Sequence, residues 1–295
     1  MRRWRPHLLF GAILFFAVSS QGQTAVENPQ PPPVDKTVQV FLTASDKQGS
    51  PATTSQSEIS VSVDKQPAQI GGLRSAKNDP LLFAVLVDTS GSRARAAEEI
   101  KQTTLELFQG LATAGNQGYL VLFNHSIAIS TRPLQILEVK GLLDSVRFGP
   151  GTALYDAIEQ TCVQKLGRLG NPDNPRRAIL LITDGDDNQS HVTHTDLEAA
   201  VEKEGVAVFS MATWSSLEGT RGEKFLKEVS HDTGGQAIIV KNLADGVAPL
   251  LSAIENQASL TFVPAQSLGQ GVHSLDIKSS EKDVRISGPA HIFVQ

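Results

Sequence analysis

Cysteine is nearly absent from the sequence, since Cys162 is the only one in 295 residues. An intrachain disulfide is therefore excluded, so the folded chain must be stabilised by its packed core or in part by a bound metal. Cys162 lies in the run ALYDAIEQTCVQKL, whose spacing indicates a helix. In that setting a buried structural thiol is a better interpretation than a nucleophile.

The sequence also lacks an excess of basic residues and is poor in aromatic ones. Its formal net charge is −5, and aromatic residues make up 5 % of the chain. This charge offers no basic surface of the kind that binds nucleic acid, so we expect no nucleic-acid partner. The 295 residues are enough for one large domain and one small domain, and the 40 % of hydrophobic residues can form an aliphatic core.

The apolar run near the N-terminus, LLFGAILFFAV at residues 8–18, is too short to span a bilayer comfortably. Arg2, Arg3 and Arg5 precede it, and the small and polar residues SSQGQTA follow it. This order is typical of a secretory signal peptide, which we place at residues 1–22. We therefore expect an exported protein, periplasmic or secreted, with no transmembrane span after cleavage; an uncleaved anchor is the alternative.

Two stretches with the period-two pattern of β-strands flank the middle of the chain. After a Pro-rich linker at residues 23–36, residues 37–78 contain the alternating runs TVQVFLT and EISVSVD, and the alternation returns in residues 259–295. Each stretch is too small to bury much surface alone. We therefore predict that they pair into one small accessory β domain, with two separate flaps as the alternative.

Between these stretches, residues 80–257 alternate apolar runs with segments of helical spacing. The apolar runs LLFAVLVD, YLVLFN, AILLIT, VAVFSMAT and AIIV indicate buried strands, and SIAIST indicates an edge strand. We expect helices between them, including one at residues 153–168 and a last one that Pro249 interrupts. The alternation predicts an α/β fold with a doubly wound, mostly parallel sheet.

Three loops of this predicted sheet carry oxygen-bearing side chains. Asp88, Ser90 and Ser92 follow the first strand of the α/β region, Thr152 lies in the Gly-rich run GPGT before a helix, and Asp184 follows the strand AILLIT. Ligands of open α/β sheets bind outside the carboxyl ends of the strands, so we expect these loops to open at one edge. Taken singly, each residue has a simpler explanation as a helix cap or a turn residue.

Together, the three loops resemble the metal-ion-dependent adhesion site of von Willebrand factor A (VWA) domains. That site combines a D-x-S-x-S strand end, a threonine in a Gly-rich loop and an aspartate in a T-D-G turn; the matching runs here are DTSGS, GPGTALYDAI and LLITDGDD. The run TGGQAIIV is similar to the family's last helix-to-strand turn. The resemblance covers residues 80–257 and implies a Rossmann-like fold. The whole order of segments also resembles bacterial exported proteins described as having VWFA-related domains.

The resemblance implies a divalent cation held by Asp88, Ser90, Ser92, Thr152 and Asp184. Mg²⁺ is the expected ion, with Ca²⁺ or Mn²⁺ as alternatives, because hard cations take oxygen ligands. By resemblance the two serines touch the metal directly, while Thr152 and the two carboxylates bind it directly or through water. Such a cation keeps excess positive charge and can take an Asp or Glu carboxylate of a partner protein as its last ligand. We therefore expect a non-enzymatic, exported adhesion or scaffold module.

Two other metal patterns fail on specific residues. An EF-hand loop that begins at Asp184 is excluded, because its sixth position is Gln189 rather than Gly and its twelfth is Thr195 rather than Glu. His191 and His194 have the spacing of zinc ligands, but no second pair lies nearby in the sequence. A solvated loop and helix start is the better interpretation of these histidines.

Two alternative functions stay open. A structural envelope protein could use the metal only to stabilise its fold. A metal-dependent hydrolase or phosphatase is less favoured, because an aspartyl-phosphate phosphatase needs a second Asp where Ser90 stands, and these motifs position no general base.

Overall fold

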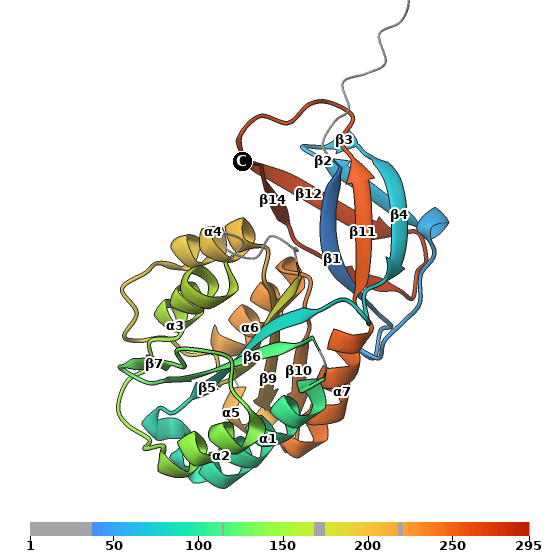
Figure 1. The fold of residues 1–295 in the computed structure, drawn as a ribbon. Coiled ribbons are helices and arrows are strands. Elements are labelled where there is room, and N and C mark those ends of the chain that lie inside the picture. Colours follow the sequence, from blue (N-terminus) through green and yellow to red (C-terminus); the bar gives the residue numbers. More distant parts are fainter. Residues whose placement is uncertain (1–36, 114, 168–174, 218–220, 295) are drawn as a thin grey trace, which may run out of the picture. The chain divides into compact units, whose positions relative to one another are not determined.

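The computed structural model describes residues 37–113, 115–167, 175–217 and 221–294 (Figure 1). The predicted signal peptide at residues 1–22 and the linker at residues 23–36 lie outside the described residues and stay predictions. Within the described ranges, no helix has both the length and the apolar character needed to cross a bilayer.

Six strands form the central sheet, in the order β10-β9-β8-β5-β6-β7. They are β5 (Leu81–Asp88), β6 (Gln117–Phe123), β7 (Ile127–Ile129), β8 (Arg176–Ile182), β9 (Ala207–Thr213) and β10 (Ala237–Val240). The strands are parallel except β7, which runs antiparallel to β6 at one edge. Every residue of β5 and β8 is buried, as expected of central strands with both faces covered.

Helices cover both faces of this sheet (Figure 1). On one face, α1 (Ala97–Leu111), α2 (Ile136–Ser145) and α7 (Ala244–Glu255) share a hydrophobic core with Phe83 and Val85 of β5. On the other face, α3 (Leu154–Thr161), α4 (His194–Glu204) and α6 (Arg221–Asp232) share a core with Ala84 and Leu86. The prediction of an α/β fold with a doubly wound, mostly parallel sheet is confirmed.

Shorter elements connect these helices and strands. They are the 3₁₀ turns η1 (Gln56–Glu58) and η2 (Gly91–Ala96), the π-helical turn η3 (Cys162–Leu166) and the single turn α5 (Trp214–Leu217). The helix predicted at residues 153–168 is α-helical to Thr161 and continues directly as the π-helical turn η3 to Leu166. The interruption predicted at Pro249 was wrong, because Pro249 lies inside α7. A proline there removes one backbone hydrogen bond, while the buried face of α7 still packs on the sheet.

The strand order reverses between β5 and β8. The chain goes from β5 to β6 on one side and then crosses back to β8, β9 and β10 on the other. At such a switch point the flanking connections leave on opposite faces, which opens a crevice at the carboxyl ends of the two strands. β5 ends at Asp88, and β8 ends at Ile182, directly before Thr183 and Asp184. The topology therefore brings two of the predicted loops to one crevice.

The accessory β part consists of two four-stranded sheets, in the orders β13-β1-β11-β4 and β14-β12-β2-β3. The strands are β1 (Val38–Ser45), β2 (Ile59–Val63), β3 (Gln66–Pro67), β4 (Gln69–Ser75), β11 (Ala258–Val263), β12 (Gly271–Ser279), β13 (Arg285–Ser287) and β14 (His291–Val294). β1 pairs with β11 and β13, and β2 pairs with β12, so each sheet mixes strands from both stretches. Their apolar side chains share one core. The accessory β domain of the fold prediction is thus confirmed, and two separate flaps are excluded.

Candidate metal site

Asp88 ends the buried strand β5 and is itself completely buried, at 0 % exposure. Its two carboxylate oxygens have different partners. Oδ1 accepts a hydrogen bond from the Ser90 backbone N–H at 2.8 Å, and Oδ2 accepts one from the Thr183 hydroxyl at 2.7 Å. Asp88 therefore fixes the turn after β5 and joins it to the end of β8 across the switch point.

Two hydroxyls and a second carboxylate continue from this turn toward solvent. The Ser90 and Ser92 hydroxyl oxygens lie 3.0 Å apart, and the Ser92 hydroxyl donates to Asp184 Oδ2 at 3.2 Å. Ser90 and Asp184 are buried, whereas Ser92 is exposed. Ser90 precedes η2 but makes no side-chain capping hydrogen bond. Its hydroxyl faces the other site oxygens, which argues against a plain capping role.

The loop that carries Thr152 is tied to both of the other loops. The Gly149 N–H donates to the Thr89 carbonyl at 2.9 Å. Thr152 and Asn188 bond reciprocally: Thr152 N–H donates to Asn188 Oδ1, and Asn188 N–H donates to the Thr152 carbonyl, both at 3.0 Å. The N-cap of α3 is Ala153 and has no side-chain capping bond, so Thr152 is not a helix cap.

The five predicted residues are therefore not joined equally. Hydrogen bonds link Ser90, Ser92 and Asp184 in one chain, and Asp88 is attached to it through the Ser90 backbone. Thr152 is buried, at 5 % exposure, and its backbone N–H bonds to Asn188. Within the described residues, no hydrogen bond joins the Thr152 hydroxyl to the other four site residues.

Two glycines allow the loops to approach one another. Gly151 has φ +73° and Gly185 has φ +79°, a left-handed conformation that other residues rarely adopt. A Cβ at Gly185 would also lie 2.6 Å from the Gly222 carbonyl oxygen. The sequences GPGT and TDGD therefore need glycine at these positions to bring Thr152 and Asp184 to the crevice.

The site holds more negative charge than its own side chains neutralise. Burial raises the pKa of Asp88, and the nearby Asp184 carboxylate raises it further, against lowering by hydrogen bonds from Ser90 and Thr183. Burial and the charge of Asp184 also raise the pKa of Asp186. Among the described residues, no Lys, Arg or His forms an ion pair with Asp88 or Asp184. A cation would relieve this repulsion.

The donor set also fits a hard cation better than a soft one. Across the described part of the chain, no group of three or more His, Cys, Asp or Glu side chains could hold a metal. The crevice instead combines two carboxylates with serine hydroxyls, and oxygen donors of this kind suit Mg²⁺, Ca²⁺ or Mn²⁺. The residues present therefore fit the predicted ion.

Asn188 and Asp156 position these loops, although the sequence alone assigned no role to either of them. Asn188 clamps Thr152, as described above. Asp156, in the first turn of α3, accepts hydrogen bonds from the His191 and Val192 backbone N–H groups at 2.8 and 2.9 Å. Its other oxygen lies 3.0 Å from His191 Nδ1. Asp156 therefore anchors the loop after Asp184 to α3, and the backbone and ring of His191 both take part in this contact. The only signal in the sequence was an acid in a helix's first turn, which is common.

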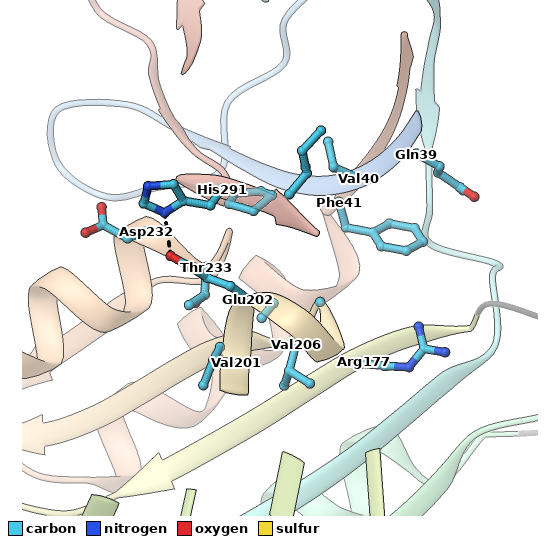
Figure 2. Close-up of a pocket in the computed structure, with 14 residues that line it drawn as sticks. Gln39, Val40, Phe41, Arg177, Val201, Glu202, Val206, Asp232, Thr233 and His291 are labelled. Atoms are coloured by element: carbon cyan, nitrogen blue, oxygen red, sulfur yellow. Dashed lines mark hydrogen bonds and ion pairs between the residues drawn. The ribbon is translucent and has the colours of Figure 1, made fainter. Parts of the chain in front are cut away.

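A small cavity lies at the opposite, amino ends of β8 and β9 (Figure 2). Its lining includes Arg177 and Ala207 at the starts of these strands, together with Phe41 and His291 of the β strands and Glu202 of α4. His291 Nδ1 is hydrogen-bonded to Glu202 across it. Its volume of about 40 Å³ has room for a few waters at most, well below the size of a ligand pocket. It is a packing gap rather than a second site.

No protein-family model and no curated protein matches this sequence. Among solved structures, the chain is similar to proximal thread matrix protein 1 from the mussel byssus, described with a zinc-occupied MIDAS motif. The TM-score is 0.49 and the identity 15 %, over 65 % of this chain and 49 % of that one. The chain thus spans about half the length of the mussel protein.

Two further neighbours are matched over nearly their whole length. An aerotolerance-related membrane protein from Bacteroides fragilis gives a TM-score of 0.47 at 17 % identity, covering 59 % of this chain and 98 % of that one. The VWA domain of SpRpn10 gives 0.44 at 12 % identity, covering 56 % and 93 %. A VWA domain is thus among the solved structures to which this chain is similar. At these identities and TM-scores, what the crevice binds has to follow from its own residues.

Proposed function

We propose that the crevice holds a divalent cation through Asp88, Ser90, Ser92, Thr152 and Asp184. One observation carries the proposal: the hydroxyls of Ser90 and Ser92 and the carboxylate of Asp184 form one chain of contacts of 3.0 and 3.2 Å beside the buried Asp88. Oxygens at these separations can turn toward a common ion with small rotations. Mg²⁺ is the first candidate, with Ca²⁺ and Mn²⁺ next.

The cation would serve recognition rather than catalysis. Three of the five residues offer neutral hydroxyls, and carboxylates that bind through water would leave the ion's direct protein ligands neutral, so the ion could still take a charged oxygen ligand. Ser92 is exposed, which places that ligand position at the protein surface. An acidic side chain of a protein partner supplies both the charge and the oxygen. The function proposed is therefore metal-dependent binding of a protein partner, in adhesion or as a scaffold.

The N-terminal sequence supports placing this module outside the cytoplasm. The order of basic, apolar and then small polar residues in 1–22 is that of a cleavable signal. Intact-mass analysis of material collected from the periplasm or the medium should show a chain that has lost Met1. Exported material with Met1 still attached would remove this part of the proposal.

Partner binding is tested by affinity capture from the native cell envelope, with Mg²⁺ or with a chelator. Wild-type protein should retain a partner in Mg²⁺ and release it in chelator. The double variant Ser90→Ala/Ser92→Ala is the matched control: it keeps the fold but removes two ligand oxygens, so it should retain nothing in either buffer. On the partner, changing one Asp or Glu to its amide should be as damaging as chelation.

Two results would redirect the proposal. A partner that binds the double variant in chelator as tightly as wild type would move recognition to another surface and leave the metal a structural role. Turnover of a phosphate ester that disappears in Asp88→Ala would show that the site is catalytic.

A further inference from the structure

The strand β10 forms an edge of the central sheet and pairs only with β9 in the sheet of the described residues. The Ser210 N–H of β9 donates to the Gln236 carbonyl. Residues along a parallel strand turn their backbone groups alternately to the two sides, so those of Ala237 and Ile239 face away from β9. An open strand edge of this kind is a template for pairing with another chain.

A groove of about 950 Å³ lies along this open edge, far larger than the cavity at the amino ends. β10 forms its floor. The 45–51 loop and Trp214 also line the groove. Near Ala237, Gln236 Nε2 donates to the Gly49 carbonyl at 2.7 Å and holds the 45–51 loop in place. At the other end, Val240 pairs with Thr213, which is followed by Trp214, 56 % exposed.

The two walls of the groove differ in chemistry. Lys227 and His231 of α6 line one wall, on the face of the sheet where Ile239 packs. Ala248 and Pro249 of α7 line the opposite wall. A strand added to β10 would place alternate side chains toward these walls. The walls therefore favour a strand in which acidic and apolar residues alternate.

The charge of the groove favours an acidic occupant. Its ionisable lining residues are Asp46, Lys47, Lys227, His231 and Arg285, a basic set in a chain of net charge −5. Asp46 Oδ1 already accepts from two backbone N–H groups of its own turn. Lys47, Lys227 and His231 pair with acids outside the lining, and these exposed pairs are weak and easily exchanged.

We propose that this groove binds an extended segment of a protein partner with alternating acidic and apolar residues, added as a strand to the edge of β10. Main-chain hydrogen bonds to Ala237 and Ile239 would supply affinity, and the basic and apolar walls would supply specificity. The site is separate from the metal crevice and needs no cation.

The test uses a fluorescently labelled synthetic peptide of alternating Glu and Val or Ile, with its ends blocked. Fluorescence anisotropy should show saturable binding to the purified protein, equal in Mg²⁺ and in chelator. Ala237→Pro removes one outward N–H at the first position of an edge strand, where proline is tolerated, and should weaken binding about tenfold. Ala237→Ser keeps that N–H and should bind as wild type.

A second variant keeps the test decisive if Ala237→Pro does not fold. Lys227→Glu changes an exposed wall residue and should weaken the acidic peptide about tenfold while improving binding of the same peptide with Lys in place of Glu. Three results would overturn the proposal: no binding by wild type, equal binding of acidic and basic peptides, or full binding by a folded Ala237→Pro variant. Loss of binding in chelator would instead place the peptide at the metal crevice.

Discussion

Arg176 and the pair Asp88 and Asp184 are buried at opposite ends of the central sheet, and their hydrogen-bond partners differ in kind. At the amino end of β8, the buried Arg176 guanidinium donates to the Ile254 carbonyl at 2.8 Å and to the Asp79 carbonyl at 3.2 Å. At the carboxyl end, the buried Asp88 and Asp184 carboxylates meet only hydroxyl and N–H donors among the described residues.

This difference indicates that one end of the sheet contributes to stability and the other end to ligand binding. Arg176 bonds to backbone carbonyls of the chain itself, so it needs no outside ligand. Asp88 and Asp184 at the carboxyl end have no ion-pair partner among the residues that the structure describes, which is costly unless a cation joins them. We infer that the amino end holds the fold together, whereas the carboxyl end is organised around a ligand. The predictions below change one end at a time.

The largest effect on stability is expected at the amino end. Arg176→Ala removes a charged donor from the Ile254 and Asp79 carbonyls and should lower the free energy of unfolding by about 3 kcal/mol. Urea unfolding should show the same loss with and without Mg²⁺. Arg74→Ala is the matched control, because Arg74 pairs with Asp79 at an exposed position and should cost less than about 1 kcal/mol. Equal costs for the two variants would contradict the assignment of this end to stability.

At the carboxyl end, the effect should appear only when metal is present. Mg²⁺ at about a hundred times its dissociation constant should stabilise the wild-type protein by about 2.7 kcal/mol, because it binds only the folded state. Asp88→Ala should remove this gain, whatever it does to the metal-free protein. Calorimetric melting with and without Mg²⁺ measures the gain directly. The same gain in both proteins would place the metal elsewhere.

A smaller effect is expected one step away from the ion. Asn188→Ala removes the side chain that holds Thr152 and should weaken metal binding about tenfold, as the loss of an orienting residue does in other metal sites. Melting in chelator should stay close to wild type. Asn188→Asp keeps an acceptor for the Thr152 N–H and should keep most of the affinity. If Asn188→Ala binds metal as tightly as wild type, the Asn188 contact does not position Thr152 for metal binding.

The smallest effect belongs to the periphery of the amino end. His291 pairs with Glu202 beside the small cavity, and both side chains keep some exposure, 42 % and 17 %. His291→Ala should therefore lower the free energy of unfolding by only about 0.5 kcal/mol and leave metal binding unchanged. A loss of stability as large as that expected for Arg176→Ala would show that the His291–Glu202 pair stabilises the fold as strongly as a buried ion pair.

Much of this molecule could be predicted because the deciding signals are local. The continuous apolar runs of the central sheet predicted buried strands, and β5 and β8 are buried at every residue. The burial predicted for Cys162 is also confirmed: its side chain is completely buried, and that burial raises the pKa of the thiol.

Other features depend on contacts that no local pattern reveals. Asn188 meets Thr152 across 36 positions of the chain, and Asp156 meets His191 across 35. In the sequence, Asn188 lies inside the excluded EF-hand pattern that begins at Asp184, and nothing local points to its contact with Thr152. The interruption expected at Pro249 was wrong because packing of α7 on the sheet outweighs the loss of one backbone bond. Intrinsic helix propensity has little influence on a segment whose apolar face is buried against the rest of the protein.

The metal site is tested most directly by a calorimetric titration of metal-stripped protein with Mg²⁺, repeated with Ca²⁺, Mn²⁺ and Zn²⁺. We expect one divalent-cation site per chain in the wild type and none in Ser90→Ala/Ser92→Ala, while both proteins melt at nearly the same temperature in chelator. Binding of the same stoichiometry and affinity in the double variant would contradict the claim that the carboxyl end of the sheet is a metal site.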